Sequence, residues 1–170
     1  MSKTKRRLNL NVGINTTGYL ANAWKYRSGD RHDINDIGYY RRLTELAHKG
    51  RFDAVFLSDH PALLTDPASR PFHTIDPLIL STSLAAQVPD IGFVATVSST
   101  YNSPYNFARR TQSIDLVTGG RLIVNIVSSF NPNVAANFGN DPLPPRSERY
   151  AKATEFLDVA KKLWSSWDPR

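Results

Sequence analysis

The chain of 170 residues contains no cysteine. A disulfide framework, a thiolate metal site and a cysteine nucleophile are therefore excluded. No run approaches the roughly 18 apolar residues of a membrane span, and polar residues rather than an apolar signal core follow the basic start at Lys3, Lys5, Arg6 and Arg7. We expect a soluble cytoplasmic protein with no membrane partner.

Three patterns that identify common protein classes are also missing. No aromatic-basic stripe accompanies the basic start, so we interpret the net charge of +6 as a solvated surface and predict no nucleic-acid partner. Gly13 and Gly18 lack the G-x-G-x-x-G spacing of a dinucleotide domain. No G-x-S-x-G elbow follows any predicted strand, which argues against a serine hydrolase.

Strand and helix patterns alternate along the whole chain, which we interpret as a single domain over residues 1–170. Apolar patterns typical of strands cover residues 8–14, 54–58, 91–97 and 121–127. Helical periodicity covers residues 34–50, 76–87 and 104–119, followed by a final helix whose periodic face is Tyr150, Ala153, Leu157, Ala160 and Trp164.

Helix-start and helix-stop residues support these boundaries. Asp33 is a candidate cap for the first helix, and Gly50 is a candidate for the left-handed residue that ends it. Asp76 followed by proline is a strong start signal, and Pro104 suits the first position of the third helix.

This alternation implies right-handed crossovers and a mostly parallel α/β sheet. A small doubly wound sheet and half of a TIM-type (β/α)8 barrel both fit four strand-helix units. The missing glycine-rich turn and the long loops after the first, second and fourth strands favour the barrel. We predict about the first four βα units of such a barrel.

Each predicted strand ends in polar residues, and the second, from Ala54 to Ser58, delivers Asp59 and His60 together. The other exits hold Asn15 and Thr16, the run from Thr96 to Thr100, and Asn125 with Ser128. Because the carboxyl ends of parallel strands face the ligand in such proteins, these groups predict a pocket for a polar heterocycle. The alternative is that each one caps a helix or forms a turn.

Two other charged groups have more than one interpretation. Asp59, His60, His73 and Asp76 are possible ligands for zinc or iron, but Asp76 is better explained as a helix cap and no second histidine pair supports a metal site. Arg146 and Arg149 open the final helix, where the macrodipole disfavours cations. Either Glu148 offsets them or they bind an anionic ligand.

Five segments together resemble a known family. They are residues 51–60 (RFDAVFLSDH), 95–109 (ATVSSTYNSPYNFAR), 120–129 (GRLIVNIVSS), 136–139 (ANFG) and 149–150 (RY). They are similar to the amino-terminal half of the bacterial-luciferase-like flavin monooxygenases. The most similar branch contains nitrilotriacetate monooxygenase component A, pristinamycin IIA synthase and dibenzothiophene-sulfone monooxygenase.

This resemblance implies the oxygenase component of a two-component, FMN-dependent monooxygenase. A separate NAD(P)H-dependent flavin reductase supplies reduced FMN to such enzymes. Oxygen adds to the reduced flavin to give a C4a-hydroperoxide, which oxidises carbon, nitrogen or sulfur in a small organic substrate. The protein holds the flavin and shields it from water.

The resemblance also implies flavin contacts at particular positions. Asp59, Thr96 and Tyr150 match flavin-contacting residues, and Asn125 matches the usual asparagine of the fourth strand. Arg146 replaces a flavin-contacting histidine and is expected to meet a phosphate. No catalytic residue is assigned.

Family members are about twice as long or longer, so we expect this chain to be a fragment, a truncated product or one piece of a split enzyme. Its outer strands would then be open edges that pair with another copy or with a missing carboxyl-terminal half. The corresponding alternative function is a non-catalytic remnant that acts only by association. A metal-dependent barrel hydrolase is a third interpretation.

Overall fold

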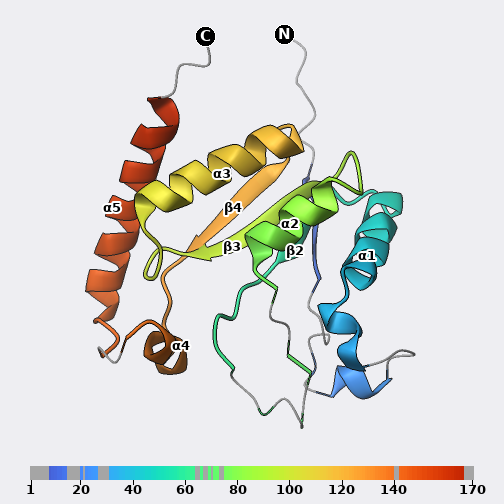
Figure 1. The fold of residues 1–170 in the computed structure, drawn as a ribbon, viewed down its shortest axis with the longest axis horizontal. Coiled ribbons are helices and arrows are strands. Elements are labelled where there is room, and N and C mark those ends of the chain that lie inside the picture. The colour runs from blue at the N-terminus through green and yellow to red at the C-terminus, as the bar shows by residue number, and fades with distance from the viewer. Residues whose placement is uncertain are drawn as a thin grey trace.

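The computed structural model describes residues 8–14, 20, 22–26, 31–63, 66, 69, 71–72, 75–139 and 142–166. Four parallel strands pair in the order of the sequence, as Figure 1 shows. They are β1 (Asn11–Gly13), β2 (Ala54–Leu57), β3 (Gly92–Ser98) and β4 (Leu122–Val127). The predicted parallel α/β sheet is confirmed, although β1 is shorter than the predicted strand over residues 8–14.

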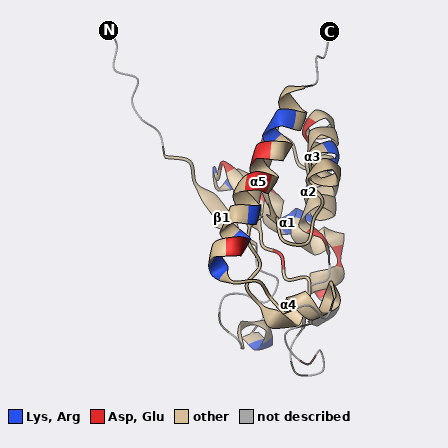
Figure 2. Ribbon diagram, turned by 90° about the vertical axis from the view of Figure 1, so that its left-hand side faces the viewer, with Lys and Arg blue, Asp and Glu red and all other residues tan. Residues whose placement is uncertain are grey.

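Helices connect these strands, and the longer ones lie on one side of the sheet (Figures 1 and 2). The α-helices are α1 (Ile37–Lys49), α2 (Pro77–Ala85), α3 (Pro104–Thr118), α4 (Pro132–Asn137) and α5 (Arg146–Ser165), and the 3-10 helices are η1 (Ala23–Tyr26) and η2 (Arg31–Asn35). Within the described ranges, none of the helices has both the length and the apolar character that crossing a membrane requires.

Two of the predicted helix starts are confirmed, whereas the N-cap of α1 and the left-handed residue that follows this helix differ from the prediction. The Asp76 side chain accepts hydrogen bonds from the N–H groups of Leu78 and Ile79, and Pro104 is the first residue of α3. The N-cap of α1 is Asp36 rather than Asp33, because residues 31–35 form η2. Gly50 has a φ of −75°, and Arg51 takes the left-handed conformation instead, with a φ of 63°.

The core has two parts, each between the sheet and a pair of helices. The part under α1 and α2 contains Ile14, Tyr40, Ala47, Val55, Leu57, Leu80, Leu84, Ala85, Val88, Ile91 and Phe93. The part around α3 and α5 contains Leu78, Ala95, Val97, Phe107, Ala108, Phe156 and Ala160. Burial of these apolar side chains is the main force that holds the helices on the sheet.

Arg121 joins several elements at the amino-terminal end of the sheet, just before β4. Its guanidinium donates to the carbonyl oxygens of Ala85 (2.6 Å), Val88 (2.9 Å), Ile91 (3.3 Å) and Thr118 (2.8 Å). It also lies 5.8 Å from the centre of the Phe93 ring. One side chain therefore ties the ends of α2 and α3 to the start of β3.

Each outer strand pairs on one side only within the described part of the sheet. β1 pairs with β2, and β4 pairs with β3. Most residues of β4 are only half-buried, and Ile123 is 50% exposed. The described sheet is thus open at both edges, unlike a closed barrel.

Candidate functional site

Thr96 and Asn125 lie side by side on the face of the sheet away from the helices. They are register partners in β3 and β4, and the Asn125 side-chain amide donates to the Thr96 hydroxyl at 3.2 Å. Thr96 is buried, and Asn125 is half-buried. Their neighbours Ala95 and Val124 pack in the apolar core, so strand alternation turns Thr96 and Asn125 to the opposite face.

A hydroxyl network joins the carboxyl ends of the same two strands. The side-chain oxygens of Ser98 and Ser129 are 2.7 Å apart, and the backbone N–H of Thr100 donates to Ser98 at 3.2 Å. The Thr100 hydroxyl accepts from the backbone N–H of Ser129 at 3.2 Å. These cross-strand bonds fix the loops that follow β3 and β4 relative to each other.

Asp59 follows β2 by two residues and is half-buried. Burial raises its pKa from 3.8 to about 6, with a further increase from the nearby charge of Asp76 and an opposing effect from the backbone N–H of His60. Asp76 caps α2, so the fold itself brings the two carboxyl groups near each other. The pKa of Asp59 therefore lies well above the usual range of an aspartate.

The first turns of α5 carry basic side chains near the ends of β3 and β4. Arg146 is exposed, and its guanidinium lies 5.3 Å from the centre of the Tyr150 ring. Arg149 donates to the carbonyl oxygens of Pro144 (3.0 Å) and Ser129 (2.8 Å), and the Lys152 ammonium donates to that of Thr100 (3.0 Å). These bonds attach the start of α5 to the exits of both strands.

Helix α4 was not predicted, although Asn131 followed by proline is the same kind of start signal as Asp76 with Pro77. The Asn131 side chain accepts from the backbone N–H of Asn133, and Asn137 donates to the carbonyl of Pro61 at 2.9 Å. At the end of the helix, Phe138 stacks on Tyr101 with ring centres 4.3 Å apart. Sequence periodicity carries no signal for a contact of this kind between two loops.

The structure therefore arranges the predicted site residues in three groups: Thr96 with Asn125, Arg146 with Tyr150, and Asp59. Within the described ranges, no hydrogen bond or ion pair joins one of these groups directly to another. The links between the first two run through Ser129, Thr100 and the basic residues of α5. Sequence reasoning missed Lys152 as part of this connection.

Some of the predicted candidates fall outside the described residues, namely Asn15, Thr16 and His73. Among the residues that are described, no group of three or more histidine, aspartate or glutamate side chains is arranged to hold a metal ion. The metal interpretation of Asp59, His60, His73 and Asp76 therefore receives no support from the described residues.

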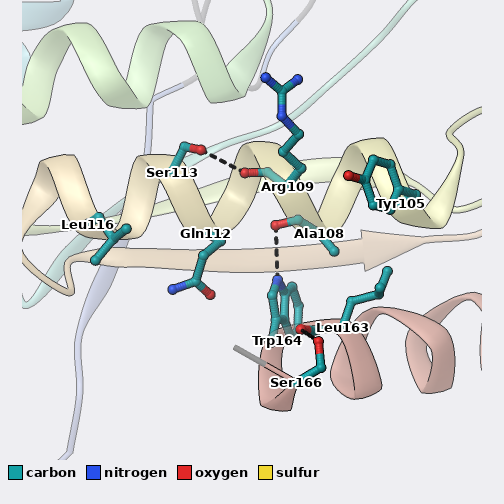
Figure 3. A pocket seen from close by; sticks show the side chains of 9 residues that line it. All are labelled: Tyr105, Ala108, Arg109, Gln112, Ser113, Leu116, Leu163, Trp164 and Ser166. Atoms are coloured by element: carbon teal, nitrogen blue, oxygen red, sulfur yellow. Dashed lines mark hydrogen bonds between the residues drawn. The ribbon is translucent and has the colours of Figure 1, made fainter. Parts of the chain in front are cut away.

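The cavities on the helical side of the described sheet include two next to α3 and α5. One, of about 320 Å³, lies between α3 and α5 and includes Tyr105, Arg109, Leu116 and Trp164 among its lining residues (Figure 3). The Trp164 indole N–H donates to the Ala108 carbonyl at 3.2 Å, and this bond joins α5 to α3 at the edge of the cavity. The other, of about 440 Å³, is bounded by β4, α3 and α5. None of the five predicted site residues lines either cavity.

The fold and the position of the polar residues define the class of protein. Four consecutive strand-helix units form a parallel sheet, with helices on one face and polar side chains at the carboxyl ends of the strands. This is about half of a TIM-type (β/α)8 barrel.

The family follows from comparison with known proteins. The family model for luciferase-like monooxygenases matches residues 17–169. The chain belongs to this family, which confirms the resemblance found in the sequence.

Individual relatives match nearly all of this chain. The long-chain alkane monooxygenase of Geobacillus thermodenitrificans (strain NG80-2) is 36% identical over 166 residues, which cover 91% of this chain and 38% of the relative. Nitrilotriacetate monooxygenase component A of Aminobacter aminovorans is 35% identical over 173 residues, which cover 95% of this chain and 38% of the relative.

A solved structure is likewise similar to nearly all of this chain. EDTA monooxygenase from Chelativorans sp. BNC1 superimposes with a TM-score of 0.88 at 41% identity, over 94% of this chain and 38% of that protein. The chain thus spans about two fifths of the length of the relatives that it matches.

Proposed function

We propose that the chain is the amino-terminal part of the oxygenase component of a two-component monooxygenase, which uses reduced FMN and O2 to oxidise a small organic substrate. A separate NAD(P)H-dependent flavin reductase is its expected partner. Membership of the family supports this proposal, as do the names of relatives such as nitrilotriacetate monooxygenase component A. A riboflavin lyase structure with modified FMN also resembles the chain, with a TM-score of 0.81 at 26% identity.

The observation that carries the proposal is that Thr96 and Asn125 are paired on two strands whose following loops are bonded to basic residues in the first turns of α5. Their hydroxyl and amide are neutral hydrogen-bonding groups, which suit the nitrogen and oxygen atoms of a flavin ring. Arg146 offers an exposed guanidinium at the positive end of α5, where a phosphate is favoured. Arg149 and Lys152 donate to backbone carbonyls and add positive charge nearby. These donor types fit FMN.

In this arrangement Thr96 and Asn125 would hold the ring, while Arg146 and Tyr150 would hold the phosphate end. Reduced FMN, when bound, supplies the electrons with which one oxygen atom of O2 is transferred to the substrate. The half-buried Asp59 carboxyl holds a proton below about pH 6 and carries a charge above it. It can therefore offer a hydrogen-bond donor or a negative charge, depending on pH.

Flavin titration of the 170-residue chain tests the proposal. Reduced FMN, added without oxygen, is expected to bind saturably at micromolar concentration. Arg146→Gln is expected to weaken FMN about tenfold and to leave riboflavin, which has no phosphate, unchanged, since a hydrogen bond to a charged group contributes about 1.5–3 kcal/mol. Arg41→Gln, in an exposed ion pair of α1, is the matched control and should change neither affinity. Absence of saturable FMN binding would contradict the proposal for this chain.

A second candidate function is favoured by the open edges of β1 and β4, which pair on one side only within the described sheet. A non-catalytic chain that acts by associating with a second copy, or with the carboxyl-terminal half of a barrel, would use these edges. Sedimentation at increasing protein concentration, in the presence and absence of FMN, separates the two functions. Association without flavin binding would support the second.

A further inference from the structure

The loop after β3 holds one polar group that the contacts of the fold leave unexplained. Around it, the Asn102 side chain donates to the Ser98 carbonyl at 2.8 Å and accepts from Arg110 at 2.8 Å. The carbonyl and hydroxyl oxygens of Thr100 accept from Lys152 and from Ser129. Tyr101, between Thr100 and Asn102, has a buried hydroxyl oxygen with no hydrogen-bond partner among the described residues.

A buried hydroxyl without a partner destabilises the folded chain, because it loses its bonds to water and gains none in return. The stacking of the Tyr101 ring on Phe138 does not need this oxygen, since a phenylalanine ring would stack equally well. Native proteins keep few such groups, and those they keep call for a specific explanation. A ligand that supplies the missing partner is one such explanation.

The position of Tyr101 indicates which part of a ligand it would meet. Thr96, in the proposed ring site, lies five residues earlier along the same strand and loop. On the other side, the Thr100 carbonyl is bonded to Lys152 of α5, the helix that carries Arg146 and Tyr150 of the proposed phosphate site. Tyr101 therefore lies in the segment that connects the two parts of the site. In FMN, the ring and the phosphate are joined by the ribityl chain, which carries hydroxyl groups.

We propose that the Tyr101 hydroxyl binds a hydroxyl group of the ribityl chain and is thus a further flavin-binding residue. This inference rests on the proposed function. A phenol can donate to and accept from an alcohol, so the two groups match without any change of charge. Phe138, which is 52% exposed and stacks on the same ring, borders this position.

Tyr101→Phe tests the inference, because it removes the hydroxyl and keeps the ring. Dissociation constants are measured by flavin fluorescence for FMN, for riboflavin, and for lumiflavin, which has a methyl group in place of the ribityl chain. The variant is expected to bind FMN and riboflavin about tenfold more weakly and lumiflavin equally well. Tyr105→Phe, an exposed phenol on α3, is the matched control and should leave all three values unchanged.

The thermal midpoint of the flavin-free chain provides a second readout. Tyr101→Phe should unfold at the same temperature as the parent or higher, because it removes an unpaired buried oxygen. A clear decrease would mean that the hydroxyl already has a partner within the chain, and would overturn the inference. Unchanged affinity for FMN, or equal weakening of lumiflavin, would overturn it as well. If the parent binds no flavin at all, both the proposed function and this inference fail. If the parent binds flavin and Tyr101→Phe binds it equally well, only the inference is rejected.

Discussion

The two ends of the parallel sheet satisfy their polar groups in different ways. At the amino-terminal end, the half-buried Arg121 donates to four backbone carbonyls, and the Asp53 carboxylate accepts from the backbone N–H of Leu10 at 2.7 Å. At the carboxyl end, Asn125 bonds the Thr96 hydroxyl, the carboxyl of Asp59 has a raised pKa, and the buried hydroxyl of Tyr101 has no hydrogen-bond partner in the described part of the chain.

We infer from this difference that one end of the four strands serves stability and that the other is the end available for the proposed flavin binding. Side chains at the amino-terminal end bond to the backbone, so they hold helices and strands together. At the carboxyl end, Arg149 and Lys152 also bond to backbone carbonyls, but Asn125 bonds to the Thr96 side chain and the Tyr101 hydroxyl has no partner among the described residues. These last two groups leave capacity for a ligand at some cost in stability. Barrel proteins of this kind place their ligands at the carboxyl end for the same topological reason.

The largest effect is expected from Arg121→Met. This change leaves the carbonyls of Ala85, Val88, Ile91 and Thr118 without their donor, and should lower the free energy of unfolding by about 3 kcal/mol. Urea denaturation measures this change in the free energy of unfolding. Arg41→Met, which removes only an exposed ion pair with Glu45, should lower it by no more than about 0.5 kcal/mol. Equal midpoints for the two variants would show that Arg121 does not stabilise the amino-terminal end.

Asn125→Ala should have a small effect on stability and a larger effect on flavin affinity. Loss of its bond to Thr96 should change the free energy of unfolding by less than about 1 kcal/mol, since Asn125 is only half-buried. The affinity for reduced FMN should fall about tenfold, which corresponds to about 1.4 kcal/mol. Fluorescence titration and urea denaturation of one preparation give both values. A large loss of stability with unchanged affinity would contradict the division of roles between the two ends.

Asp59→Asn should stabilise the chain at pH 8 by about 1 kcal/mol, because it removes a carboxylate whose charge is disfavoured by burial. This value is smaller than the free energy that corresponds to the whole pKa shift, because the group is partly exposed to solvent. Since the pKa is raised on folding, the stabilising contribution of the protonated carboxyl is complete below pH 3.8. It is lost as the pH rises through about 6. Thermal midpoints between pH 4 and pH 8 should therefore decrease with pH in the parent more than in the variant.

Asp76→Asn is a matched control for this pH effect. Asparagine caps a helix about as well as aspartate does, so α2 should keep its start. The charge that raises the pKa of Asp59 is removed, so the decrease in stability should move to lower pH. A pH profile identical to that of the parent would exclude Asp76 as a cause.

The smallest effect is expected from Ser129→Ala. It removes the bond between the side chains of Ser98 and Ser129, while the bonds of the Ser129 backbone to Thr100 and Arg149 remain. The free energy of unfolding should fall by about 0.5–1 kcal/mol. Urea denaturation measures this change, and a loss as large as that of Arg121→Met would show that hydroxyl bonds at the carboxyl end stabilise the fold as strongly as the arginine does.

Local patterns predicted most of the fold because they act over short distances. Asp76 with Pro77 and the apolar runs of the strands specify where elements begin, whatever the rest of the chain does. The end of α1 at Gly50 was predicted correctly, but the left-handed conformation was assigned to Gly50 instead of Arg51, because the two are adjacent and periodicity does not decide between them. Helix α4 was missed because six residues are too few to show a periodic face.

The arrangement of the candidate site residues was predictable where it depends on topology and not where it depends on loops. Thr96 and Asn125 are adjacent because parallel strands of consecutive units pair in register. The stacking of Tyr101 on Phe138 joins two loops, and their meeting depends on how α4 is placed. The role of Lys152 depends in the same way on the angle at which α5 meets the sheet.

The sequential order of the strands also has a consequence for folding kinetics. Pairing of β1 with β2 joins residues such as Asn11 and Ala54, which are 43 positions apart, whereas Thr96 and Asn125 of β3 and β4 are 29 positions apart. Closing the shorter loop costs less conformational entropy, and contacts between residues that are near in sequence form faster. We therefore expect β3, α3 and β4 to assemble before the three-residue β1 joins the sheet. The strands that carry Thr96 and Asn125 would then be among the first parts of the chain to reach their native arrangement.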